Sequence, residues 1–177
     1  MNQMKRSLCA LLSALMLLAM LAGCGKKQET DEPFVLGVSV CGAIDSLDPA
    51  MNTDTDADSI FYALYENLMR MSDDGSGEAV LGNGVAKEYT EETNYDGTVT
   101  YRFTLRSSAR WSDGQKMTAD DFVYAWQRLA DPATASPNHS LMSVVAGYDE
   151  VRETGDKTKL QVSAEDESTF VVTLSAP

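Results

Sequence analysis

Residues 109–137, ARWSDGQKMTADDFVYAWQRLADPATASP, carry the most distinctive local pattern of the chain. Residues 109–117 are typical of a strand end followed by a turn, because Asp-Gly favours tight turns. Thr118 is typical of a helix N-cap, with acidic residues in the first turn after it. Apolar residues then recur at helical spacing. They are Phe122, Val123, Trp126 and Leu129. We therefore predict a turn, then a helix that ends near Asp131-Pro132.

Strands are predicted on both sides of this stretch. Residues 85–90 and 99–105 favour extended structure, and the Asp96-Gly97 dipeptide between them is typical of a hairpin turn. Apolar and polar residues alternate over 101–106, which indicates one buried face and one solvated face. A further strand is predicted over 170–174. Residues 85–105 are therefore expected to form an antiparallel hairpin.

Residues 34–58 are interpreted as a strand, a turn and a helix cap. A strand is predicted over 34–40, and Pro49 closes it in a turn because proline cannot continue a ladder. The oxygen-rich residues 52–58 could suit a calcium ion, but they lack the glycine and the bidentate acid that an EF-hand loop requires. The alternative is that one of three acids caps the helix that follows. These acids are Asp54, Asp56 and Asp58. No metal site is predicted.

A helix is predicted over 58–70, because apolar side chains recur there at near-helical spacing. The stripe consists of Ile60, Leu64, Leu68 and Met71, widened by Phe61 and Tyr65. Such a stripe is more often part of a core than of a cofactor site. Residues 72–77 are rich in Asp, Ser and Gly and are predicted to form a loop.

The first residues have the pattern of an export signal. Lys5 and Arg6 precede an uncharged apolar run of about 14 residues, which is too short for a comfortable membrane span. The next residues, Leu21-Ala22-Gly23-Cys24, resemble the lipobox of bacterial lipoproteins. In that family the Cys24 thiol receives a diacylglyceryl group and the chain is cut before it. The alternative is a plain secretory signal in which Cys24 is incidental.

The cysteines and the net charge limit what the processed chain can do. Cys41 would be the one unmodified cysteine, so no intramolecular disulfide is predicted, and its apolar surroundings favour a buried side chain over a reactive thiol. The 177 residues include 14 Lys and Arg against 27 Asp and Glu, a net charge of −13. Loss of Lys5 and Arg6 with the signal would leave 12 − 27 = −15. This charge repels phosphate backbones, so nucleic acid is excluded as a partner.

Nothing in the sequence has the pattern of a known catalytic motif. It lacks a nucleophile elbow, an H-E-x-x-H motif, a phosphate loop and a Cys-His couple. The abundant carboxylates are the one feature that would suit a lipid-anchored hydrolase. We therefore expect neither an enzyme nor a cofactor.

The stretch quoted first closely resembles the signature of the oligopeptide-binding family of extracellular solute-binding proteins, the receptors of peptide ABC importers. That family carries a W-S-D-G turn, a T-A-x-D-F cap, then W-x-R and D-P-x-T-A-S-P, in this order. They occur here at 111–114, 118–122, 126–128 and 131–137. The family's S-L-D-P, F-E-G-L, W-T-F-x-L-R, A-G-x-D-E and T-L-x-x-P segments have counterparts at 46–49, 65–68, 99–106, 146–150 and 171–177. The resemblance extends from about residue 35 to residue 177.

The resemblance implies an α/β, periplasmic-binding-protein-like receptor with two lobes, of type II and of the large peptide-binding subclass. It implies that this chain is the N-terminal part of such a receptor. The expected domains are a lipoprotein signal peptide at 1–23, a lipidated tether at 24–33 and part of the solute-binding domain at 34–177. Within the last, 34–48 would be the first main-lobe strand, 49–165 the accessory α+β domain, and 166–177 a strand that returns to the main lobe.

The implied function is that of the substrate-binding lipoprotein of an ABC importer, which captures oligopeptides outside the cytoplasmic membrane. Its partners would be an oligopeptide, the permease and ATPase subunits, and the membrane through the lipid on Cys24. The protein would be a monomer on the outer face of the cytoplasmic membrane, at the cell surface or in the periplasm. The alternative is a peptide-binding scaffold, chaperone-like holder or sensor that is not coupled to import.

The resemblance also implies four ligand contacts. The family's loop after S-L-D-P touches the peptide, which maps onto Thr53, Asp54 and Thr55, and the residue after the S-P of the last motif is Asn138 where the family often has Tyr. The loop is more acidic here than in the family, and the alternative is that all four are only turn and cap residues. Structural roles are expected for Trp111, Asp113, Gly114, Phe122, Trp126 and His139.

Overall fold

The computed structural model describes residues 35–37, 39, 42 and 44–175. The chain divides into two compact units, residues 1–39 and 40–177, and the fold below is that of the second unit. The predicted signal peptide and tether, the lipidation of Cys24 and the burial of Cys41 lie outside the described residues.

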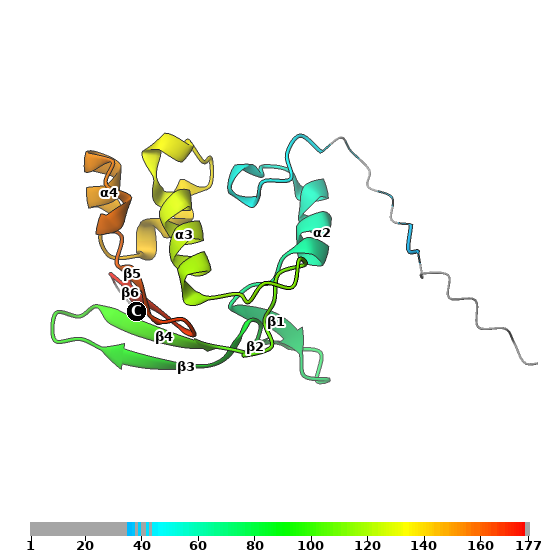
Figure 1. Cartoon of the computed structure of the whole chain (residues 1–177), viewed down its shortest axis with the longest axis horizontal. Coiled ribbons are helices and arrows are strands. Elements are labelled where there is room, and N and C mark those ends of the chain that lie inside the picture. The colour runs from blue at the N-terminus through cyan, green and yellow to red at the C-terminus, as the bar shows by residue number, and fades with distance from the viewer. Residues whose placement is uncertain (1–34, 38, 40–41, 43, 176–177) are drawn as a thin grey trace, which may run out of the picture. The chain divides into compact units, whose positions relative to one another are not determined.

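A four-stranded antiparallel sheet, in the order β3-β4-β6-β5, is the larger of the two sheets that the described residues form (Figure 1). The strands are β3 (Ala86–Thr93), β4 (Val99–Leu105), β5 (Val162–Asp166) and β6 (Thr169–Leu174). β3 and β4 form the hairpin that the sequence predicts, and Gly97 in its turn has the positive φ of 86° that favours glycine. The strand expected over 170–174 is confirmed as β6.

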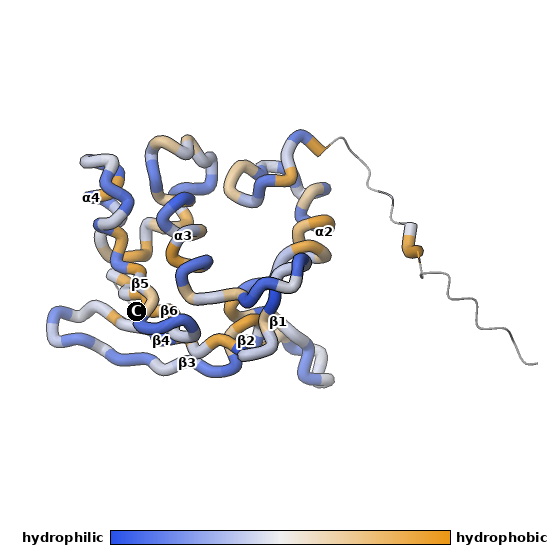
Figure 2. Tube along the Cα trace, in the orientation of Figure 1, coloured by the Kyte–Doolittle hydropathy of each residue, from blue (hydrophilic) through white to orange (hydrophobic). Residues whose placement is uncertain are grey.

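Helices α3 (Ala119–Ala130) and α4 (Tyr148–Thr154) lie on one side of this sheet (Figure 1). The 3₁₀ segments η2 (Pro132–Thr134) and η3 (His139–Val144) lie between α3 and α4 in the chain, and η4 (Lys157–Lys159) lies between α4 and β5. The fully buried Phe170 ring lies 5.8 Å from the ring of Phe122 and 5.2 Å from that of Trp126, between centroids. Hydrophobic residues are accordingly concentrated where α3 and α4 meet β5 and β6 (Figure 2). This layer is the core.

The turn and helix predicted from residues 109–137 are confirmed. Gly114 has a φ of 87°, and its N–H donates to the Trp111 carbonyl at 2.9 Å. The Asp121 carboxylate accepts the Thr118 N–H at 2.7 Å, which satisfies a donor at the start of α3. The helix ends at Ala130, directly before Asp131-Pro132.

The predicted helix over 58–70 is wrong in both bounds, because α2 spans Thr55–Leu64. After it the chain forms a second, two-stranded sheet from β1 (Met69–Asp73) and β2 (Ala79–Asn83), which the sequence reading missed. The Leu68 carbonyl accepts N–H groups from Gly84 and Ala86, so this segment is held in extended structure. A side chain at position 84 would collide with the Asn67 and Leu68 carbonyls, so this close approach requires glycine.

One other strand prediction differs from the structure. Residues 35–37 and 39, the described part of the strand expected over 34–40, have no strand assignment. β6 is an inner strand of the four-stranded sheet, between β4 and β5.

Candidate functional site

The segment before α2 is extended, with one face turned inward. From residue 44 to residue 56, half-buried and exposed residues alternate without interruption. The half-buried members include Asp48, Asn52 and Asp54, and the exposed ones include Thr53 and Thr55. A single 3₁₀ turn, η1 (Pro49–Met51), interrupts the extended backbone. The polar side chains on the inner face are therefore available to hold the segment in place.

Short local hydrogen bonds fix the backbone of this segment. The Asp48 carboxylate accepts the N–H of Ala50 at 3.1 Å, and the Asn52 side-chain oxygen accepts that of Asp54 at 2.9 Å. The Asp54 carboxylate accepts the Asp56 N–H at 2.8 Å, which makes Asp54 the N-cap of α2, as one of the sequence alternatives predicts.

The same segment is attached to residues about 80 positions later in the chain. The Arg128 guanidinium donates to both carboxylate oxygens of Asp48, at 2.8 and 2.5 Å. The Ser136 hydroxyl donates to the Ala50 carbonyl at 2.5 Å, and the Asn138 amide donates to the Asn52 carbonyl at 2.6 Å. Because Arg128 donates two hydrogen bonds to the Asp48 carboxylate, the pKa of Asp48 lies below its ordinary value.

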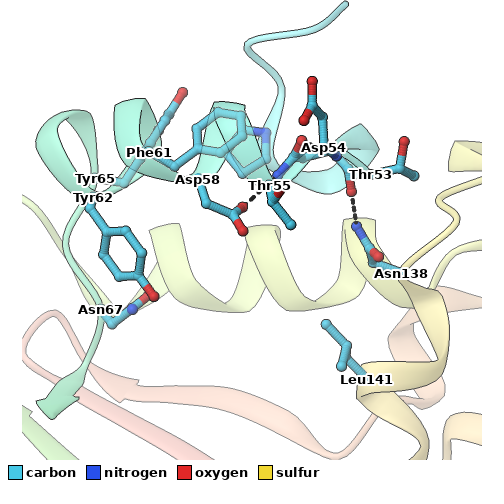
Figure 3. Close-up of a pocket in the computed structure, with 12 residues that line it drawn as sticks. Thr53, Asp54, Thr55, Asp58, Phe61, Tyr62, Tyr65, Asn67, Asn138 and Leu141 are labelled. Carbon is cyan, nitrogen blue, oxygen red and sulfur yellow. Dashed lines mark hydrogen bonds between the residues drawn. The ribbon is translucent and has the colours of Figure 1, made fainter. Parts of the chain in front are cut away.

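An open pocket of about 510 Å³ lies beside this segment (Figure 3). Residues 49–55 and α2 form one wall of the pocket, and Asn138 and Leu141 form the other. The lining residues are Pro49, Asn52, Thr53, Asp54, Thr55, Asp58, Phe61, Tyr62, Tyr65, Asn67, Asn138 and Leu141. All four residues that the sequence singles out for ligand contact, Thr53, Asp54, Thr55 and Asn138, therefore line one pocket.

The pocket combines acidic, amide and aromatic groups. Its charged lining residues are Asp54 and Asp58, and the Asn52 amide donates to the Asp58 carboxylate at 2.7 Å. Tyr62 is 84% exposed although it belongs to α2, so its ring is accessible to a ligand. Within the described residues, no group of three or more His, Cys, Asp or Glu side chains could hold a metal ion. The chemistry available is hydrogen bonding and aromatic packing.

The residues expected to have structural roles have structural contacts. Asp113 accepts the N–H of Gln115 at 2.9 Å inside the W-S-D-G turn, and the indole N–H of Trp111 donates to Asp121 at 3.3 Å. His139 Nδ1 lies 2.5 Å from the Tyr148 hydroxyl. None of these residues lines the 510 Å³ pocket.

Sequence reasoning missed two features of this site. The first is the Asp48–Arg128 pair, which lies in two of the recognised motifs, S-L-D-P and W-x-R. The second is the aromatic lining of the pocket, because their helical spacing predicts Phe61 and Tyr65 as members of a core stripe. The S-L-D-P and W-x-R motifs could have indicated the Asp48–Arg128 pair, since Asp and Arg are the residues of these motifs that can form an ion pair.

Known proteins with similar sequences and structures identify the family. A family model described as bacterial extracellular solute-binding proteins, family 5 Middle, matches residues 81–177. The chain belongs to this family. The match confirms the predicted α/β, periplasmic-binding-protein-like fold class, of which the chain contains a part.

Individual relatives are similar over most of this chain and about a quarter of their own length. The periplasmic oligopeptide-binding protein OppA of Escherichia coli is 42% identical over 138 residues, which cover 76% of this chain and 24% of that protein. The probable deoxycholate-binding periplasmic protein YgiS of Escherichia coli is 38% identical over 141 residues, with coverages of 75% and 24%. The crystal structure of Haemophilus influenzae OppA in complex with RPPGFSPFR has a TM-score of 0.64 at 37% identity, over 75% of this chain and 25% of that one.

Proposed function

We propose that the intact protein is the substrate-binding lipoprotein of an ABC importer, which captures oligopeptides outside the cytoplasmic membrane and delivers them to the permease. The observation that carries the proposal is the pocket that brings Thr53, Asp54, Thr55 and Asn138 together. The resemblance to peptide receptors assigns ligand contact to these four residues from the sequence motifs alone. The similarity to OppA, a protein named for binding oligopeptides, supports the same solute class.

The loop at residues 52–55 suits recognition of a peptide main chain. Thr53 is exposed, and within the described part of the chain its backbone N–H has no hydrogen-bond acceptor. An extended peptide can pair with such a backbone whatever its side chains are, which gives tolerance of sequence. Capture of this kind requires enclosure of the peptide and no bond making or breaking. The proposal therefore includes no catalytic group, cofactor or metal.

In this proposal the described unit supplies one wall of the binding cleft. The chain spans about a quarter of the length of the relatives that it matches. Residues 34–48 and 166–177 would connect the accessory domain at 49–165 to a main lobe, and the main lobe would cover the open side of the pocket. Closure of the two around the peptide would sequester it.

The proposed location follows from the first 33 residues. A signal peptide at 1–23 would direct export, and acyl chains on Cys24 would anchor a monomer to the outer face of the membrane through the tether at 24–33. Two or three acyl chains anchor stably where one would not. None of the helices that the structure describes has the length and apolar character needed to cross a membrane. Labelling of cells with a radioactive fatty acid should mark the protein, and Cys24→Ala should abolish the label.

Calorimetry and native mass spectrometry of the full-length mature protein test the solute class. The peptide RPPGFSPFR and a mixture of short peptides are the first probes, and deoxycholate is the contrast. We expect peptides to bind and to be recovered intact. Binding of deoxycholate without binding of any peptide would overturn the proposed solute class, and hydrolysis of the peptides would overturn the proposal of a receptor without catalysis.

A further inference from the structure

Three motifs that are far apart in the sequence meet at one place in the fold. S-L-D-P at 46–49 supplies Asp48, W-x-R at 126–128 supplies Arg128, and D-P-x-T-A-S-P at 131–137 supplies Ser136. Arg128 pairs with Asp48, and Ser136 donates to the carbonyl of Ala50, two residues after Asp48. The motifs are thus three parts of one set of contacts, named here the loop latch, completed by the hydrogen bond from Asn138 to Asn52.

The loop latch holds every second residue of the segment at residues 48–52, directly before Thr53. Its contacts are made at positions 48, 50 and 52, which are the half-buried members of the alternating segment. The residues between and after them, Met51, Thr53 and Thr55, are exposed, and the two threonines line the pocket. Attachment at positions 48, 50 and 52 therefore fixes the backbone next to Thr53, Asp54 and Thr55, which line the pocket.

The groups of the loop latch are well suited to fixing a backbone. A planar guanidinium that donates to both oxygens of one carboxylate constrains orientation as well as distance, which a lysine cannot do. Ser136 is 2% exposed, and its hydroxyl also accepts the Asn138 N–H at 3.0 Å. It therefore connects the loop to the residue that forms the opposite wall of the pocket.

We infer that Asp48, Arg128 and Ser136 are positioning residues, which hold the loop at residues 52–55 in the conformation that receives the peptide. The inference rests on the proposed function, since it assigns these residues a role in peptide affinity without any contact with the peptide. None of the three lines the pocket. A purely structural role would affect the stability of the whole unit and leave the local order of residues 50–55 unchanged.

The test uses the full-length mature protein with Arg128→Gln, Arg128→Lys and Ser136→Ala. Arg102→Gln is the matched control, because Arg102 forms ion pairs with Glu92 at 3.1 Å and Glu165 at 3.3 Å on the sheet and does not line the pocket. We expect Arg128→Gln to weaken binding of RPPGFSPFR about ten-fold or more, because a charge-assisted pair is lost. Arg128→Lys should be intermediate, and Arg102→Gln should bind like the wild type.

Amide hydrogen exchange of the peptide-free protein is the second measurement. We expect Arg128→Gln and Ser136→Ala to raise exchange in residues 50–55 and to leave β4 and β6 protected. If the wild type binds the peptide and both variants bind it equally well, the inference is overturned and the proposed function stands. Weakened binding with unchanged exchange at 50–55 also overturns the inference. If the wild type binds no peptide, the proposed function fails first.

Discussion

Asp48 is a residue whose ionisation contributes to the stability of the fold. Its hydrogen bonds from Arg128 hold its pKa below the ordinary value of 3.8, and the same contact raises the pKa of Arg128. Tyr124 is the other titratable group that acts on Arg128. A carboxyl group whose pKa is depressed by folding contributes stability above its unfolded pKa, and this contribution disappears as the pH falls through the folded pKa.

We therefore expect the difference in unfolding free energy between the wild type and Asp48→Asn to be constant from neutral pH to about pH 5, where an unfolded aspartate begins to protonate. Below that pH the difference should shrink. Denaturant titrations at a series of pH values measure it. The difference in unfolding free energy between the wild type and Arg128→Gln should shrink over the same pH range, because this variant lacks the guanidinium that lowers the pKa of Asp48. A difference that grows as the pH falls below about 5 would contradict the assignment.

A substitution at Tyr62 should change peptide affinity without changing the stability of the fold. Its side chain is 84% exposed and lines the pocket, so Tyr62→Ala should change the unfolding free energy by no more than about 0.5 kcal/mol. In the full-length protein the same change should weaken binding of RPPGFSPFR about ten-fold, as loss of an aromatic contact does at a binding hot spot. Tyr95→Ala, at a fully exposed position in the turn between β3 and β4, is the control for both measurements. Equal affinities of the two variants would show that Tyr62 is not a contact.

At the scale of elements, residues 85–137 were the easiest part to predict. The Asp-Gly turn and the N-cap at Thr118 are local signals, and the structure confirms both. The alternation predicted over 101–106 is wrong, because β4 is an inner strand and residues 101–104 are all half-buried. The end of α2 could not be predicted in this way. The stripe from Ile60 to Met71 has helical spacing, but the Asn67 and Leu68 carbonyls accept N–H groups from residues 84–86 and are thereby held outside a helix, and β1 begins at Met69. Met71 is accordingly 63% exposed.

The same limit applies to the site. The positions of Thr53, Asp54, Thr55 and Asn138 followed from a motif, but their convergence depends on the Arg128–Asp48 pair, whose members are 80 residues apart. No spacing rule predicts which of several arginines and aspartates will pair, because the sheet and α3 determine that. The arrangement of the site therefore depends on tertiary contacts that local sequence patterns do not predict.

Helix α4 has a glycine at each end, which allows a matched test of a backbone requirement. Gly147 has a φ of 84° and Gly155 a φ of 74°, so an L-residue is strained at both positions. A side chain at 147 would also collide with the Lys159 carbonyl, whereas position 155 is open. We expect Gly155→Ala to cost about 1 kcal/mol of unfolding free energy, from backbone strain alone. Gly147→Ala should cost at least about 2 kcal/mol, because the collision adds to the strain. Thermal unfolding measures both, and equal losses would show that the contact with Lys159 relaxes freely.

At the scale of the whole molecule, the net charge of −13 and the acids in the pocket act on a ligand before contact. Asp54 and Asp58 are the charged residues of the pocket lining, and the field of the protein has the same sign. Such a field raises the association rate of cations and is screened by salt. If the pocket receives a peptide as proposed, we expect one with arginine at both ends, such as RPPGFSPFR, to be attracted and an acidic peptide to be repelled.

The pocket of the described unit is open, so the 177-residue chain alone should bind a peptide weakly. A pocket of about 510 Å³ with one wall on the loop and α2 and the other on Asn138 and Leu141 is too open to bury a nonapeptide on all sides. Small-molecule and peptide sites bind tightly when most of the ligand surface is removed from water, since that burial must offset the entropy lost on association. We therefore expect calorimetry with RPPGFSPFR to detect no specific binding to this chain, although circular dichroism should show its sheet and helices folded. The full-length mature protein should bind the same peptide under the same conditions. Equal affinity of the two would show that the pocket is a complete site by itself and that the proposed main lobe takes no part in binding.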